Sequence, residues 1–319
     1  MVRTLIAVVA LSLALLSASL SGTAWAQQAI PERAPVPGSA EDLIQQAQKL
    51  SRAGKLDEAL ALYRQAIETS PKSPNVYLAH MGAGIVLDLE GKYAEAQEHL
   101  NLAVETAPAD SRPQALRALA ISYAFEGKPG RSADYESQVF SGRVNRGDWI
   151  GAAEICNELA RIYLEAGDAN SAEKWYKMGN ETAARKTDLT EADKNLWLFR
   201  WESAQARIAA RRGQASEAQA HLAAAKAALD RANNPDQMRF YPYLTGYVAF
   251  YTGDYKTAIA ELQKADQQDP LNLALLGEAY EKSGDAAKAR DYYRKVLEIN
   301  SHNPTNAFAR PLAKRKLGV

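Results

Sequence analysis

Apolar residues recur at the same offsets around seven glycines along this chain, and each recurrence predicts two helices joined by a tight turn. Small residues at fixed helical steps let two helices approach closely, and larger apolar residues fill the space between them. The first two copies agree in residue type at Ala47, Leu50, Gly54, Leu56, Ala59, Tyr63, Ala66 and Pro71, and at Gly84, Leu87, Gly91, Tyr93, Ala96, Leu100, Ala103 and Pro108. The pattern therefore predicts an all-α chain of repeated helix pairs.

Further copies continue the pattern nearly to the end of the chain. Their loop glycines are Gly127, Gly167, Gly213, Gly253 and Gly284. The third copy is the weakest, because Pro129 replaces a usual residue and Gly130 predicts a turn that is one residue longer. The widest spacing falls between the fourth and fifth loop glycines, where Thr190 is expected to cap a long helix that reaches Arg212.

The recurring residues resemble the tetratricopeptide repeat family, whose period is about 34 residues with small, aromatic, alanine and proline positions. The resemblance implies a right-handed superhelix of about seven antiparallel helix pairs over residues 41–300. It also implies an interaction scaffold in which the first helix of each pair lines the concave face. An ordinary helical bundle is the alternative, but a bundle needs no fixed period.

The ends of the chain follow other patterns. Residues 1–26 have an apolar run from Leu5 to Leu20 and a small-x-small end at Ala26, which predicts a cleavable export signal. A periplasmic or secreted location follows, and an uncleaved membrane anchor is the alternative. Residues 27–40 are proline-rich and predict a flexible tether. Ser39, followed by Asp42, is expected to cap the first helix.

Residues 301–319 are expected to form a C-terminal capping segment. Asn303 and Pro304 have the residue types of a helix N-cap and first helical position, and Pro311 is expected to bend or end that helix. Lys314 and its two basic neighbours are expected to make the outer side of this segment polar.

Composition narrows the possible partners. The 38 lysine and arginine residues balance 38 aspartate and glutamate residues, so no global field attracts nucleic acid. A membrane is expected as a partner only if the leader is uncleaved. Cys156 is the single cysteine and is expected to be buried and inert. The four histidines are scattered, and neither metal ligands nor catalytic residues are recognisable, so we expect no metal, no cofactor and no enzymatic activity.

A candidate ligand site follows from the first helices of the fourth to sixth repeats. Positions counted back from the loop glycines place a basic row beside an aromatic row on the concave face that the resemblance implies. The candidate peptide-binding residues are Arg161, Arg200, Arg207, Arg211, Tyr243, Tyr247 and Tyr251. Arginine and tyrosine are enriched at binding hot spots, and arginine holds carboxylates in two-point geometry. Tyrosines at helical spacing also fit packing between repeats.

Two functions are compatible with these observations. The first is an exported scaffold that binds a protein or peptide segment with at least one acidic group in its concave groove, in envelope assembly or secretion. The alternative is a repeat domain with a small-molecule or glycan site near the aromatic row, conceivably with hydrolytic activity.

Overall fold

The computed structural model describes residues 36–319, which form one compact unit. Within these residues the chain is helical and has no strand. The helices are α1 (Ala40–Arg52), α2 (Leu56–Thr69), α3 (Val76–Glu90), α4 (Tyr93–Thr106), α5 (Arg112–Phe125), α6 (Pro129–Asn145), α7 (Trp149–Glu165), α8 (Ala169–Ala183), α9 (Glu191–Arg211), α10 (Ala215–Ala232), α11 (Pro235–Met238), α12 (Tyr241–Tyr251), α13 (Tyr255–Leu262), α14 (Pro270–Lys282), α15 (Ala286–Glu298) and α16 (Pro304–Leu317).

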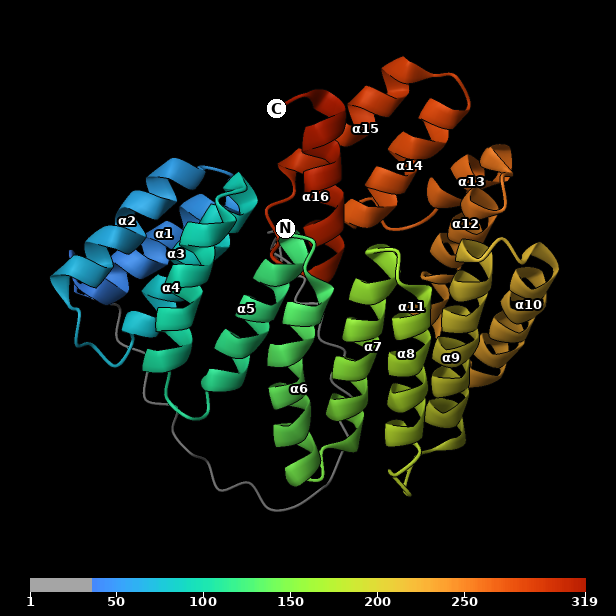
Figure 1. Ribbon diagram of the computed structural model, residues 1–319, viewed down its shortest axis with the longest axis horizontal. Helices are drawn as coiled ribbons and strands as arrows, with labels where there is room; N and C mark the ends of the chain where they lie inside the picture. Colours follow the sequence, from blue (N-terminus) through green and yellow to red (C-terminus); the bar gives the residue numbers. More distant parts are fainter. Residues whose placement is uncertain (1–35) are drawn as a thin grey trace, which may run out of the picture. The chain divides into compact units, whose positions relative to one another are not determined.

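Consecutive helices pack as seven pairs, which confirms the predicted helical-repeat solenoid (Figure 1). The pairs are α1–α2, α3–α4, α5–α6, α7–α8, α9–α10, α12–α13 and α14–α15, and the four-residue helix α11 joins the fifth pair to the sixth. Each second helix also packs against the first helix of the next pair. Neighbouring first helices touch along the inner side of the row, as α3 does with α5 and α12 does with α9 and α14.

The turn inside each pair is built on the predicted loop glycine. All seven loop glycines have φ between +73° and +93°, a left-handed conformation that a residue with a Cβ adopts only at a cost. Small residues elsewhere permit close helix contact. A Cβ on Gly246 of α12 would lie 2.6 Å from Cγ of Leu262 in α13, so only glycine fits there. Local sequence therefore sets both the turn and the spacing of the pair.

Three predicted helix caps are confirmed by hydrogen bonds to backbone N–H groups. Ser39 Oγ accepts from Asp42 N at 3.2 Å, and Asn303 Oδ1 accepts from Asn306 N at 2.8 Å. Thr190 Oγ1 accepts from Asp193 N at 3.1 Å, while the Asp193 carboxylate accepts from Thr190 N at 3.3 Å. Such reciprocal bonds satisfy two N–H groups that a helix start leaves unpaired.

Two local predictions are wrong. The third turn is no longer than the others, because Lys128 directly follows Gly127 and α6 begins at Pro129. Proline at the first helical position loses no hydrogen bond, since that N–H has no helical partner anyway. Of the two outcomes expected at Pro311, the end of the helix is wrong, because α16 continues through it to Leu317. The bend stays a prediction. Burial of α16 residues on both sides of Pro311, including Ala307 and Ala313, favours the continuous helix over the break.

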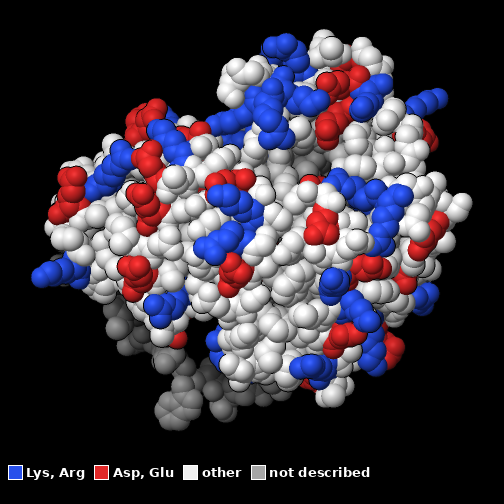
Figure 2. Space-filling model, viewed as in Figure 1, with Lys and Arg blue, Asp and Glu red and all other residues white. Residues whose placement is uncertain are grey.

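The expected export signal, residues 1–26, lies outside the described residues, as does all of the expected tether before residue 36. These two assignments stay predictions. Between residues 36 and 319 no helix combines the length and apolar character that crossing a bilayer requires. Charged side chains of both signs are scattered over the largely uncharged face drawn in Figure 2, and basic ones gather over the C-terminal helices at its top. The expectation that Lys314 faces outward is wrong, because its Nζ donates to the carbonyl of Glu90 at 2.7 Å, whereas Arg315 and Lys316 are exposed.

Candidate functional site

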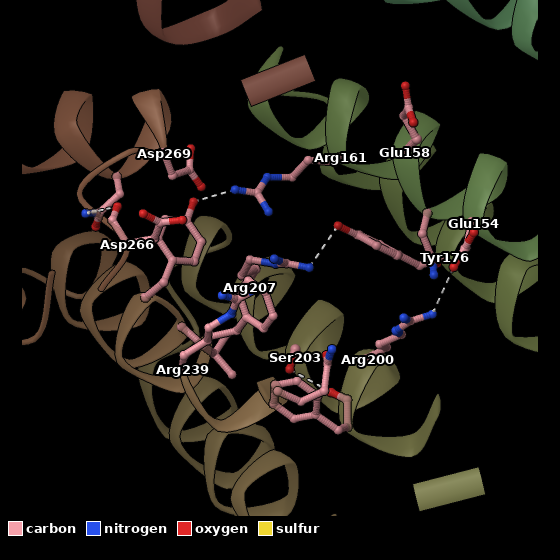
Figure 3. A pocket seen from close by; sticks show the side chains of 17 residues that line it. Glu154, Glu158, Arg161, Tyr176, Arg200, Ser203, Arg207, Arg239, Asp266 and Asp269 are labelled. Carbon is pink, nitrogen blue, oxygen red and sulfur yellow. Dashed lines mark hydrogen bonds and ion pairs between the residues drawn. The ribbon is translucent and has the colours of Figure 1, made fainter. Parts of the chain in front are cut away.

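A pocket of about 400 Å³ opens among the fourth to seventh repeats. Its walls come from α7, α8, α9, the segment from α11 into α12, and the start of α14. The arginine side chains that line it are Arg161, Arg200, Arg207 and Arg239, which Figure 3 labels around the hollow. Aromatic walls are supplied by Tyr176, Phe199, Phe240 and Tyr243.

The long helix α9 places two of these arginines. Arg200 and Arg207 are seven residues apart, so they lie on one face of the helix, two turns from each other. Ser203 lies between them and donates to the Phe199 carbonyl, which keeps its hydroxyl close to the helix. The sequence prediction that these arginines share a face is therefore sound.

Arg161 and Arg211 are held by the protein itself. Arg161 donates from Nε to the Glu165 carboxylate at 2.9 Å and from Nη2 to the Tyr243 hydroxyl. Arg211 donates from Nη1 to the Tyr251 hydroxyl, and its Nη1 lies 3.7 Å from the same Glu165. One carboxylate thus joins two arginines that bond two of the predicted tyrosines. This network ties the fourth, fifth and sixth repeats together.

The middle tyrosine of the predicted row is part of the core. Tyr247 is 0% exposed, and its ring centroid lies 6.0 Å from that of Tyr243 and 4.6 Å from that of Tyr251. Its hydroxyl has no hydrogen-bond partner within residues 36–319. Of the seven predicted site residues, Arg161, Arg200, Arg207 and Tyr243 line the pocket, whereas Arg211, Tyr247 and Tyr251 do not.

Arg207 is the pocket arginine that has a buried nitrogen atom without a hydrogen-bond partner. Its Nη2 donates to the Tyr176 hydroxyl at 3.1 Å, but its buried Nε has no partner in the described part of the chain. Among those same residues, no carboxylate lies within ion-pair distance of Arg207 or Arg239. Arg200 has only a long contact of 3.7 Å to Glu154. A buried donor without an acceptor costs about 1–3 kcal/mol, so an anionic ligand here would relieve that cost.

Two of the four carboxylates that line the pocket, Glu158 and Asp269, bond to groups outside it. Glu158 accepts two hydrogen bonds from Arg117 Nε, at 3.0 and 3.1 Å, and one from Arg117 Nη2 at 2.8 Å. Asp269 caps α14 by accepting from Leu271 N at 2.9 Å, and burial raises its pKa even though Arg161 opposes the shift. Burial likewise raises the pKa of Glu154, although Arg200 opposes it. Arg207 and Arg239 therefore have no carboxylate partner among the described residues, although Glu154 and Asp266 also line the pocket.

Some functional candidates carried no usable sequence signal. Arg239 lies in the connection after α11, outside the repeat pattern, and Tyr176 occupies a position that the repeat explains as packing.

His80 and His99 were expected to be separate, but their Nδ1 atoms lie 3.0 Å apart. Nineteen residues separate them along the chain, which is not a spacing that one helix brings together. Cys156 is buried, as expected.

In residues 36–319, no group of three or more His, Cys, Asp or Glu side chains is arranged to hold a metal ion. The pocket is lined by arginines, carboxylates, aromatic rings and amides.

The seven packed helix pairs define a helical-repeat interaction scaffold. Three models described as tetratricopeptide repeat match residues 50–120, 153–181 and 270–303. The chain is a tetratricopeptide repeat protein, which confirms the resemblance. Proteins of this family are typically non-enzymatic scaffolds that mediate protein–protein interaction.

Similar proteins extend the comparison. The cellulose synthase operon protein C of Escherichia coli is 24% identical over 266 residues, which are 82% of this chain but 19% of that protein. The chain therefore spans about a fifth of that relative. A tetratricopeptide repeat protein from Parabacteroides merdae has the same fold, with a TM-score of 0.51 at 13% identity over 87% of this chain and 98% of its own. The pilF structure of Pseudomonas aeruginosa has a TM-score of 0.45 at 12% identity, over 79% of this chain and 96% of its own.

Proposed function

We propose that this scaffold binds a segment of a partner protein through an acidic group seated in the pocket of the fourth to seventh repeats. The observation that carries the proposal is the buried, unpartnered Nε of Arg207 beside the unpaired Arg239. A carboxylate can accept from two guanidinium N–H groups at once, and such bonds are stronger than neutral ones. We therefore propose Arg200, Arg207 and Arg239 as the ligand-binding residues. The first two belong to the set predicted from sequence, and Arg239 is added from its place in the pocket.

The aromatic walls supply the second half of the recognition. Phe240 is partly exposed at the edge of the pocket, with Arg239 stacked 4.9 Å from its ring centroid. Tyr243 and Phe199 extend the apolar surface inward. A ligand residue next to the acidic group would bury apolar area against these rings. Arg161, Arg211, Tyr247 and Tyr251 are then positioning residues, which hold α7, α9 and α12 in register.

Peptide binding is tested by selection followed by measured affinities. Peptides of fully random sequence are selected on the full chain, and their affinities are measured by fluorescence anisotropy. Arg207→Gln is expected to weaken binding about tenfold to a hundredfold, because a charge-assisted hydrogen bond contributes about 1.5–3 kcal/mol. Arg294→Gln is the control, since Arg294 is an exposed residue of α15 that pairs with Asp291. Selected peptides without acidic residues, or equal affinity in Arg207→Gln, would overturn the proposal.

A small acidic ligand is the second candidate, and the pocket volume favours it. A volume of about 400 Å³ lies within the range of small-molecule pockets, about 300–1,000 Å³. An acidic sugar could place its carboxylate on the arginines and its ring on an aromatic wall. Thermal stabilisation by uronic-acid oligosaccharides that Arg207→Gln abolishes, together with failure of the peptide selection, would favour this ligand class.

We propose the exported compartment as the setting of this scaffold, in envelope assembly or secretion. The support is the leader-like sequence of residues 1–26. One relative has a name that refers to a cellulose synthase operon, which fits a role beside a synthesis or export machinery. This chain matches about a fifth of the length of that relative. N-terminal sequencing of the exported protein should begin at Gln27. A product that keeps Met1 and is recovered only with membranes would show that the leader is retained as a membrane anchor.

A further inference from the structure

The third repeat carries a carboxyl group at a position that is apolar or aromatic in the other six repeats. This position lies nine residues after the loop glycine, on the second helix of each pair, and in the third repeat it is Glu136 of α6. The other six residues are large and buried: Tyr63, Leu100, Tyr176, Leu222, Leu262 and Tyr293. Glu136 is 0% exposed. Its carboxyl group therefore lies where the repeats otherwise have a packed core side chain.

Charged groups of both signs face Glu136 from the helices that pack against α6. Arg117 comes from α5 and Glu158 from α7, while Arg143 of α6 itself is paired with Asp148 at 2.6 Å. Arg117 donates to the Glu158 carboxylate in three hydrogen bonds, at 2.8, 3.0 and 3.1 Å. Glu158 also lines the pocket of the fourth to seventh repeats. It therefore connects the buried acid of the third repeat to that pocket.

Contact between the two carboxyl groups requires a proton. With both groups ionised, neither oxygen of Glu136 has a hydrogen-bond partner in the described part of the chain, although Glu158 lies in hydrogen-bonding contact with it. An ionised carboxylate only accepts, so one of the two groups must be protonated for a hydrogen bond to form between them. Burial, followed by the negative charge of Glu158, raises the pKa of Glu136 well above its usual range. Arg117 stabilises the charge of Glu158, so the proton resides on Glu136.

Glu158 is a carboxylate that could neutralise the pocket if it were released. It lies three residues before Arg161 on α7, and both residues line the hollow together with Arg200. No dashed line joins Glu158 to another residue of the pocket in Figure 3, because its carboxylate bonds to Arg117 instead. A carboxylate that accepts from a guanidinium group and a carboxylic acid has few free lone pairs for further donors.

We propose that Glu136 is a positioning residue: as a carboxylic acid it donates to Glu158 and, together with Arg117, keeps that carboxylate from pairing with the arginines of the pocket. Those arginines then stay available for an acidic ligand, and this part of the inference rests on the proposed function. The proton on Glu136 does not depend on it. A buried polar group stabilises a fold less than a packed apolar side chain does, so the acid at this one repeat position is explained by the contact with Glu158.

The proton is tested by the pH dependence of stability. Unfolded glutamate ionises above about pH 4.3, whereas the folded chain keeps Glu136 protonated to higher pH. Over that interval each pH unit should raise the unfolding equilibrium constant of the wild type by up to about tenfold relative to Glu136→Gln, which cannot ionise. Urea unfolding of both proteins from pH 5 to pH 8 measures this ratio. A ratio that does not change with pH would show that Glu136 is ionised in the folded protein and would overturn the proposal.

The role in the pocket is tested with an acidic peptide selected on the full chain as the probe. Glu136→Gln keeps a neutral donor of the same length, so its affinity should equal that of the wild type. Glu136→Met fills the core without a donor and should weaken binding about threefold to tenfold, the factor that one hydrogen bond contributes to an equilibrium. Adding Glu158→Gln to Glu136→Met removes the released charge and should restore the affinity.

Each part can fail separately. Equal affinity in Glu136→Gln and Glu136→Met would overturn the positioning role. Weakened binding that Glu158→Gln does not restore would also overturn it, because the loss would then come from altered packing. A selection that yields no acidic peptide would remove the proposed ligand and with it this role, whereas the pH-dependent ratio would still report the proton on Glu136.

Discussion

Removing the hydroxyl of Tyr247 should stabilise this protein, although removing the whole side chain should damage it severely. The side chain is 0% exposed, and its hydroxyl has no hydrogen-bond partner within the described residues. Its neighbours Tyr243 and Tyr251 instead bond to Arg161 and Arg211. The middle of the row therefore contributes a packed ring and an unpaired polar group.

The structure sets the size and sign of each effect. A buried hydroxyl without a partner costs about 1–3 kcal/mol. The small cavity left when the oxygen atom is removed costs only a few tenths of a kcal/mol, so the removal is favourable on balance. Tyr247→Phe should therefore raise the free energy of unfolding by about 1 kcal/mol. Tyr247→Ala removes the ring as well and should lower it by about 3–5 kcal/mol, as large-to-small aromatic substitutions in cores do.

Urea unfolding followed by far-ultraviolet circular dichroism measures both changes as shifts of the midpoint at constant slope. Tyr293→Phe is the matched control. Tyr293 is 2% exposed, but its hydroxyl donates to the Glu281 carboxylate at 3.0 Å, so its loss should cost about 1–3 kcal/mol. If Tyr247→Phe destabilises the protein as much as Tyr293→Phe does, the hydroxyl of Tyr247 has a partner and the reasoning fails.

Three further predictions follow from buried or capping groups. Burial and the nearby His99 lower the pKa of His80 to about 4, below the 6.5 of an unfolded histidine, so its contribution to stability is complete above pH 6.5 and is lost as the pH falls toward 4. Urea midpoints at pH 7.5 and 4.5 should differ less in His80→Leu than in the wild type, and an equal difference would contradict the assignment. Thr190→Ala removes the cap of α9 and should cost about 1 kcal/mol, seen as faster hydrogen exchange in its first turn; unchanged exchange would count against the cap. Burial raises the pKa of Cys156 to about 12, so a thiol reagent at pH 8 should modify it only in urea, and fast labelling of the native protein would show an open site.

The helix pairs could be predicted from local sequence because each repeat contacts mainly its neighbours. Loop glycines, small residues at helical spacing and caps such as Thr190 act within some tens of residues. The same logic correctly placed Arg200 and Arg207 on one face of α9. It failed at Pro311, where burial of α16 against distant helices outweighs the local preference of proline to end a helix.

The candidate site could be predicted only in part, since periodicity identifies a helical face but not what covers it. Tyr247 has the spacing of a ligand-facing residue, yet packing of α12 against its neighbours buries it completely. Arg239 has no periodic signal, because it lies in an irregular connection. Its place in the pocket depends on how the sixth repeat sits against the fourth.

Local sequence specifies the number of helix pairs, their turns, their caps and the balanced charge. Contacts between distant groups depend on the packing of the whole solenoid. Arg161 bonds Tyr243 across 82 positions, and His302 reaches Asp88 across 214. Small angles between successive repeats add up along a solenoid, and no local pattern encodes that sum. Accumulated curvature therefore forms the pocket and brings α16 back onto the early repeats.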